Sequence, residues 1–145
     1  MGIGANSYGS TAEVQALVKK YTISGSFTTA SYPTLVQVEG FIDKVSGIVN
    51  VLLSENGFTI PVSQASAKLA LDLFVVEEAA ALCEAANSSG RFFSEKARET
   101  GAFQTIQADA QAFIMIHAGG FEDLGAARTR SRAVAWMGAK PVVAV

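Results

Sequence analysis

The sequence predicts an all-α fold: a small helical bundle of about four helices, two of them long, with an extended C-terminal arm. Two long stretches repeat apolar residues at helical spacing, and the breaks around them are rich in Gly, Asn, Ser and Pro. The final residues show no such period. A chain of 145 residues suits one domain. We therefore expect a helical domain over 1–118 and an arm over 119–145.

The composition points to buried or partner-covered apolar surface. Half of the residues are hydrophobic and 17% are charged, whereas about a quarter is usual in soluble proteins. Either the core is large for the length or apolar surface awaits a partner; high Ala and Val content is the simpler alternative. Residues 1–118 hold 7 basic and 11 acidic side chains, net −4, and residues 119–145 hold 4 and 2, net +2. The arm thus differs in sign from the body.

A short first helix is predicted over residues 10–20. Ser10 and Glu13 have capping-box spacing, in which the Ser hydroxyl accepts from the third amide and the Glu returns a bond. Val14, Leu17 and Val18 then lie on one face. Residues 21–31 are β-branched, polar and Gly-containing, which fits a loop or a short strand equally well.

The second predicted helix begins at Pro33, whose missing N–H is not needed in a first helical turn. Gly57 can adopt the left-handed conformation that ends it after Asn56. Between them runs an apolar stripe held over five turns. Its members are Leu35, Val38, Phe41, Ile42, Val45, Ile48, Val49, Leu52 and Leu53. Gln37, Glu39, Asp43, Lys44 and Asn50 fall largely off the stripe.

A third helix follows the extended link 58–62, begins near Ser63 or Ser66, and runs to about Ala86. One face carries Ala67, Ala70, Leu71, Phe74, Val75, Leu82 and Cys83, and further apolar residues, among them Leu69, Leu73, Val76, Ala79 and Ala80, extend it almost around the helix. Such a helix is either central in its domain or lies between subunits.

The last predicted helix runs from Phe103 to His117, and Gly119 and Gly120 end it. Residues 94–98 have the composition of a single helical turn, with Ser94 as its cap. His117 would then sit at a helix end, where a histidine can interact favourably with free carbonyl groups.

No catalytic, cofactor-binding or metal-binding residue set emerges, so we expect no enzyme activity. The single histidine has no His or Glu at zinc-ligand spacing, and no Gly-x-Ser-x-Gly element frames a serine. Glu77 and Glu84 share a helical face and suit a solvated strip better than an acid–base pair. Cys83, the only cysteine, is expected to be a buried small hydrophobe. No apolar run is long enough for a membrane span, and no signal peptide is recognisable.

The candidate partner-binding residues lie in the arm. Arg128, Arg130 and Arg132 alternate, so an extended segment would point all three one way, toward an acidic surface or phosphates. A solvated charge run is the alternative. Trp136 follows, and tryptophan is a frequent interface anchor; packing onto its own subunit is equally compatible with the sequence.

With these elements placed, the layout over residues 8–118 resembles the head–tail connector (adaptor, or head-completion) proteins of tailed bacteriophages. The resemblance rests on the helix start at 8–14 (YGSTAEV), the long helix containing 38–45 (VEGFIDKV), the link at 57–61 and the helix that opens with 68–73 (KLALDL). A short helix and a tail complete the layout. These are patterns of architecture, without an invariant chemical motif.

The resemblance implies a structural virion protein without enzymatic activity or cofactor. It implies a homo-oligomeric ring, commonly of twelve subunits, under the portal protein in the virion neck, with tail-side neck proteins as further partners. DNA would pass through the ring without sequence-specific binding, and no membrane would be involved. Residues 119–145 would dock on the portal, a neighbouring subunit or a tail protein.

Three alternatives remain open at the level of sequence. A tail-completion or other neck or capsid-associated phage protein would share the same features. A small helical DNA-binding protein would use the arginine row and bind with strong salt dependence. An enzyme subunit with an unrecognised site would lose activity when His117 or the Glu77 and Glu84 pair is changed.

Overall fold

The computed structural model describes residues 2–88 and 102–129 and confirms the all-α class. Its described residues form four α-helices, with no β-sheet and only two isolated β-bridges. The helices are α1 (Thr11–Leu17), α2 (Leu35–Glu55), α3 (Ala65–Ser88) and α5 (Ala102–Asp123), and a 3₁₀ turn, η1 (Lys19–Tyr21), follows α1. The turn predicted at 94–98 and the arm beyond residue 129 lie outside the described residues.

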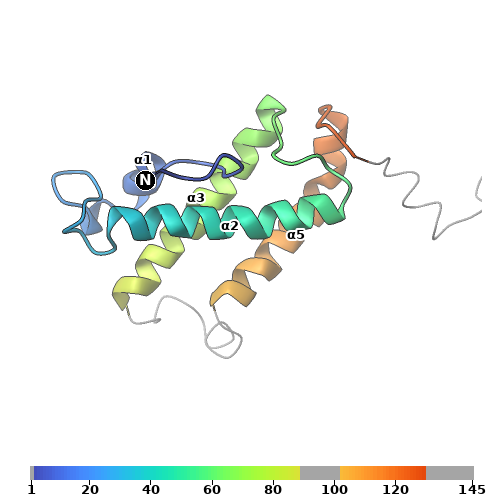
Figure 1. Ribbon diagram of the computed structural model, residues 1–145. Helices are drawn as coiled ribbons and strands as arrows, with labels where there is room; N and C mark the ends of the chain where they lie inside the picture. The colour runs from blue at the N-terminus through green and yellow to red at the C-terminus, as the bar shows by residue number, and fades with distance from the viewer. Residues whose placement is uncertain (1, 89–101, 130–145) are drawn as a thin grey trace, which may run out of the picture.

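The helices form two layers (Figure 1). The long helix α2 crosses both α3 and α5, which lie behind it and contact each other less extensively. The short helix α1 packs on both α3 and α2. The core therefore lies where α2 faces the α3–α5 pair, with Ile42, Leu53 and Leu71 among its fully buried side chains.

α2 begins two residues later than the sequence predicts. Thr34 is its N-cap and forms a full capping box with Gln37. Pro33 precedes the cap, and the Tyr32–Pro33 peptide bond is cis, so the prediction that Pro33 occupies the first turn is wrong. A hydroxyl that accepts from a free N–H outweighs the preference of proline for that turn.

The predicted stripe of α2 is confirmed as its buried face. Leu35, Phe41 and Ile48 are partly buried and the other six members are buried. The helix ends at Glu55 with Asn56 as its C-cap, and Gly57 has the expected positive φ of 85°. Two polar residues assigned off the stripe, Glu39 and Asn50, are nevertheless buried; Asn50 bonds to Tyr8 and Asn6 of the N-terminal segment.

α1 is shorter than predicted, since regular helix stops at Leu17 and the 3₁₀ turn takes up residues 19–21. Ser10 caps it as predicted, accepting from the Glu13 N–H at 3.3 Å, while the Glu13 carboxylate accepts from the Ser10 hydroxyl. The region 21–31, open between loop and strand, is irregular apart from a tight turn closed by the Ile23–Ser26 bridge.

α3 starts after Gln64, whose side chain accepts from the Ala67 N–H at 2.7 Å. The sequence indicated Ser63 or Ser66 as the start of this helix, but the side chain that accepts from its first turn is Gln64. The helix continues to Ser88. One broad face is buried against α1 and α2, whereas Leu69 and Leu73 are exposed, so α3 is central on one side and uncovered on the other.

α5 continues through the glycines that were predicted to end it and stops at Asp123. Ala118 and Phe121 are buried, and they continue the stripe of Ile106, Ala110 and Ile114 by about two turns. Burial outweighs the weak helix propensity of Gly119 and Gly120. The helix therefore passes through the boundary that was predicted between the domain 1–118 and the arm.

Residues 124–129 also belong to the helical body. Gly125 reverses the chain with a φ of 89°, and Ala126 is buried. The chain then pairs with the link that follows α2: the Thr59 N–H donates to the Ala127 carbonyl at 2.8 Å and the Thr129 N–H donates to the Gly57 carbonyl at 2.8 Å. The first part of the predicted arm is thus fixed beside the end of α2.

Candidate interaction surfaces

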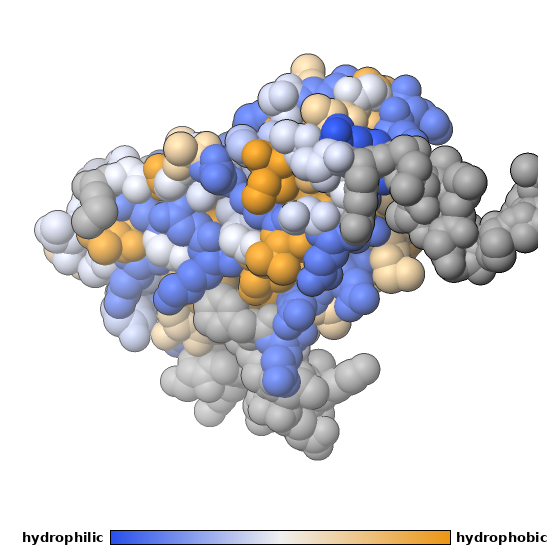
Figure 2. All heavy atoms as spheres, turned by 45° about the vertical axis from the view of Figure 1, so that its right-hand side comes forward, coloured by the Kyte–Doolittle hydropathy of each residue, from blue (hydrophilic) through white to orange (hydrophobic). Residues whose placement is uncertain are grey.

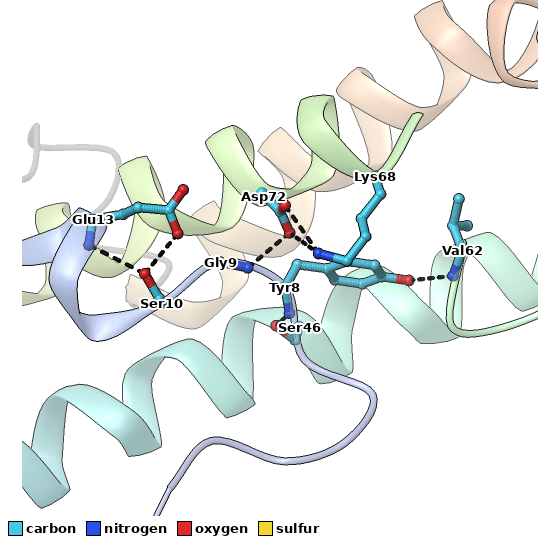
Figure 3. Close-up of polar contacts among 8 residues, drawn as sticks. All are labelled: Tyr8, Gly9, Ser10, Glu13, Ser46, Val62, Lys68 and Asp72. Carbon is cyan, nitrogen blue, oxygen red and sulfur yellow. Dashed lines mark hydrogen bonds and ion pairs between the residues drawn. The ribbon is translucent and has the colours of Figure 1, made fainter. Parts of the chain in front are cut away.

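Tyr8 is a buried residue whose polar groups join three parts of the chain (Figure 3). Its hydroxyl accepts from the Val62 N–H at 3.0 Å and donates to Asn50 Oδ1 at 2.7 Å, and its own N–H donates to Ser46 Oγ at 3.0 Å. Burial raises the pKa of this phenol, and the Val62 N–H partly offsets the shift. Tyr8 thereby joins the N-terminal segment, α2 and the α2–α3 link.

The neighbouring Gly9 lies against α3. Its N–H donates to Asp72 Oδ1 at 2.8 Å, and Lys68 pairs with the same carboxylate at 3.0 Å (Figure 3). Gly9 has a φ of 79°, and a Cβ built there would lie 2.5 Å from Val76 Cγ2. Only glycine satisfies both the left-handed backbone and this approach.

The segment before Tyr8 is held in the same way. The Gly4 N–H and the Ser7 hydroxyl both donate to Asp43 Oδ1, at 2.8 and 2.6 Å, and the Asn50 side-chain amide donates to the Asn6 carbonyl at 2.8 Å. These bonds satisfy one another within the chain, so this end of the molecule is a structural closure and offers no reactive group.

Two pairs of large apolar side chains are exposed elsewhere. Leu69 and Leu73 lie on α3, and Met115 and Ile116 lie on α5, with exposed fractions from 58% to 74%. Helices α3 and α5 meet through the stacked rings of Phe74 and Phe113, whose centroids are 4.9 Å apart. Leu69 and Leu73 belong to the wide apolar zone that the sequence indicates for α3. Met115 and Ile116 lie off the predicted stripe of α5 and were not identified as a surface from the sequence.

Most of these side chains face away from this ring contact. At about 100° per residue, Met115 lies roughly 160° and Ile116 roughly 60° around α5 from Phe113. By the same measure, Leu69 and Leu73 lie roughly 140° and 100° around α3 from Phe74. The two pairs are therefore two exposed apolar surfaces, one on each helix. We call them the α3 patch (Leu69, Leu73) and the α5 patch (Met115, Ile116).

A groove of about 680 Å³ lies between α2 and α5. It is lined by Lys44, Gly47, Ile48, Val51, Leu52, Glu55 and Gln107. Its apolar part is built by Ile48, Val51 and Leu52, and Val51 is 58% exposed. Figure 2 shows apolar atoms, in orange, grouped among hydrophilic ones on the face in view. The sequence contains a signal for this groove, because Gly47 and Val51 lie off the predicted stripe of α2 and are one helical turn apart.

The predicted arm residues are divided by the structure. Arg128 folds back onto its own chain: its guanidinium carbon lies 4.5 Å from the Phe58 ring centroid, Nη2 donates to the Asn56 carbonyl at 2.9 Å, and Nη1 is 3.7 Å from Glu122 Oε2. Its side chain is 12% exposed. Arg128 is thus a structural residue here, whereas Arg130, Arg132 and Trp136 lie outside the described residues.

The carboxylates of α3 play different parts. Glu84 accepts from the Tyr21 hydroxyl at 2.6 Å and pairs with Lys20 at 3.0 Å, and these bonds lower its pKa. Glu77 is exposed. Glu78 is half-buried, and desolvation, then Asp109 and Glu77, raise its pKa to about 7. Glu77 and Glu84, which the sequence places on one helical face, therefore do not act together in one site.

His117 does not occupy a helix end, because α5 continues for six residues beyond it. The predicted carbonyl-capping role is wrong; the imidazole packs against Phe113 instead, with ring centroids 4.8 Å apart. Cys83 is buried as predicted, and burial raises the pKa of its thiol to about 12, which makes it unreactive near neutral pH.

Within residues 2–88 and 102–129, no group of three or more His, Cys, Asp or Glu side chains is arranged to hold a metal ion. None of the helices in this part of the chain combines the length and the apolar character needed to cross a membrane. No protein-family model matches the sequence, and neither a curated protein nor a solved structure is detectably similar to it.

Proposed function

We propose that this protein is a head–tail connector (adaptor) of a tailed bacteriophage, a structural subunit that forms a ring between the portal and the tail. The proposal rests on the layout of helices described above and on one structural observation. A closely packed body leaves two apolar surfaces exposed, the α3 patch and the α5 patch.

Two different apolar patches suit a ring because a head-to-tail contact joins two different surfaces. Each subunit presents its α3 patch to the α5 patch of the next, and rotation between neighbours closes the assembly. A two-fold dimer can also join the two patches, provided that both lie within one self-complementary surface. Exposure of both pairs therefore supports contact between copies of the chain, and the connector layout is what favours a ring.

The charge of the body agrees with a channel for DNA. The described residues carry five basic and eleven acidic side chains, a net charge of −6. A ring of such subunits repels phosphates, so a genome can pass without adhering. The DNA-binding alternative is weakened by Arg128, because its guanidinium is engaged by Phe58, Asn56 and Glu122 of its own chain.

The test is the mass of the assembly. Native mass spectrometry of the purified chain should show a closed ring of one size. Leu69→Gln and Ile116→Gln should each abolish the ring while leaving the unfolding midpoint almost unchanged, since both side chains are exposed. Ile23→Gln is a matched control, because Ile23 is exposed but lies outside both patches.

Mixing the two variants sharpens the test. Each retains one intact patch, and the intact patches are complementary, so a mixture should give heterodimers and no rings. Solitary subunits at every concentration of the wild-type chain would contradict the proposal. Binding of the ring to a purified portal distinguishes an adaptor from a tail-completion protein, and a salt-dependent affinity for DNA would favour the nucleic-acid alternative.

A further inference from the structure

We propose that the groove between α2 and α5 receives the C-terminal residues 130–145, led by Trp136, from a second copy of the chain. This inference rests on the proposed ring and identifies one of its contacts. The receiving surface has an apolar part formed by Ile48, Val51 and Leu52. It is distinct from the α3 and α5 patches.

The first argument is the composition of the segment compared with the groove. Residues 130–145 include Trp136, Met137 and three valines beyond residue 140. Trp136 is the only tryptophan of the chain. A tryptophan side chain gains most when it is seated in a desolvated apolar site, and such residues dominate interface energies. A groove of about 680 Å³ has room for this side chain and its neighbours.

The second argument is the place where the segment begins. The Thr129 N–H is bonded to the Gly57 carbonyl, so residue 130 starts beside the end of α2. Trp136 lies seven residues beyond Thr129, a reach of at most about 24 Å. This reach is enough for Trp136 to contact a subunit that packs beside the end of α2.

Charge favours a second copy as the owner of the groove. Bodies with a net charge of −6 repel one another, and the basic side chains of Lys20, Lys68 and Arg128 pair with carboxylates of their own chain. Residues 130–145 hold three basic and no acidic side chains. They bring positive charge to a contact between two acidic bodies, which lowers the repulsion that an approach without them would meet.

The experiment uses the fluorescence of Trp136 in the full-length chain. In the wild-type chain the emission should be blue-shifted and protected from iodide, and it should shift to the red on dilution. Val51→Glu should cause the red shift at all concentrations, because it places a charge in the groove. Val36→Glu is the matched control, since Val36 lies on the same helix with 59% exposure against 58% for Val51.

A second pair of variants blocks the groove without adding charge. Gly47 lines the groove and Gly40 does not, and a Cβ at either position meets no atom within 4 Å. Gly47→Gln should therefore release Trp136, whereas Gly40→Gln should leave its emission blue-shifted. Circular dichroism of all four variants checks that the helices remain folded.

Mixing decides which copy supplies the segment. The Val51→Glu protein keeps Trp136 but has a blocked groove, and a Trp136→Phe protein keeps the groove but is dark. A blue shift that appears only on mixing them supports the inference. Emission that stays blue at every dilution, or that is red in the wild-type chain at every concentration, overturns it.

Native mass spectrometry of the same samples separates this inference from the proposed function. One contrary result is that rings persist in both the Val51→Glu and the Trp136→Ala variants while Trp136 emission is the same in Val51→Glu as in the wild-type chain. That result would overturn the docking of residues 130–145 and leave the connector proposal standing. A wild-type chain that forms no ring would overturn the connector proposal itself.

Discussion

Two faces of α2 differ in how the rest of the chain covers them. On one face of the helix, Asp43, Ser46 and Asn50 all bond to the N-terminal segment, and Tyr8 completes the set. On another face, Gly47, Val51 and Glu55 line an open groove. Both faces belong to the same continuous helix.

This difference separates what stabilises the subunit from what is available to partners. Buried polar groups that satisfy one another contribute to folding and are costly to disturb. Exposed apolar groups cost little to change in the isolated chain and much in an assembly. Mutations of the buried polar groups should therefore lower the stability of the isolated chain, whereas mutations of the exposed apolar groups should affect only its assembly.

The largest effect is expected at Gly9. Gly9→Ala must place a Cβ 2.5 Å from Val76 Cγ2 and hold a left-handed backbone at φ 79°. We expect a loss of about 3 kcal/mol in the free energy of unfolding, of which roughly 1–2 kcal/mol is backbone strain and the rest is the displacement of a stiff β-branched side chain. Urea unfolding measures it.

Gly25→Ala is the control for Gly9. It has a similar φ of 83°, but its Cβ would meet nothing within 4 Å. It should show the backbone contribution alone, about 1–2 kcal/mol. Equal losses at the two positions would mean that the approach of Gly9 to α3 is unimportant.

The next effect concerns the Tyr8 hydroxyl. Tyr8→Phe removes the acceptor of the Val62 N–H and the donor to Asn50 Oδ1. Both are left without this partner in a buried place, so we expect a loss of about 2 kcal/mol. The measurement is the thermal unfolding midpoint, with the exposed Tyr32→Phe as a control that should change nothing. A neutral Tyr8→Phe would remove the central claim about this closure.

A smaller effect is expected where residues 124–129 return to the body. Arg128→Ala removes the contact with the Phe58 ring and the bond to the Asn56 carbonyl, which should cost about 1–2 kcal/mol. Hydrogen exchange at the Thr59 and Thr129 amides should also become faster, since both close this pairing. If exchange is unchanged, the pairing does not depend on Arg128.

The smallest effect is a pH dependence at Glu78. Its pKa is raised to about 7 in the folded chain from 4.5, so the folded state binds more protons between these values. Stability must then fall as the pH rises from about 4.5 to 7. Because the side chain is only half-buried, solvent screening reduces the change to about 1 kcal/mol. Glu78→Gln should remove this slope in denaturation curves, and Glu77→Gln should retain most of it.

Local sequence signals predicted the helices well because their causes are local. The stripe of α2 repeats every third or fourth residue, and its end is set by Gly57. The Ser10 cap depends on residues three apart. Errors arose where distant contacts outweighed local preference. α5 passes Gly119 and Gly120 because Phe121 is buried against Phe58, with ring centroids 5.9 Å apart.

The sequence by itself determined the helical class, the buried face of α2 and the burial of Cys83, since apolar periodicity and helix caps are properties of neighbouring residues. The tertiary structure decided which apolar residues remain exposed, why Gly9 must be glycine, and that Arg128 serves its own chain. These depend on segments 30 to more than 70 residues apart in sequence, such as Arg128 and Asn56. No local pattern records such a contact, because it exists only when the helices have packed.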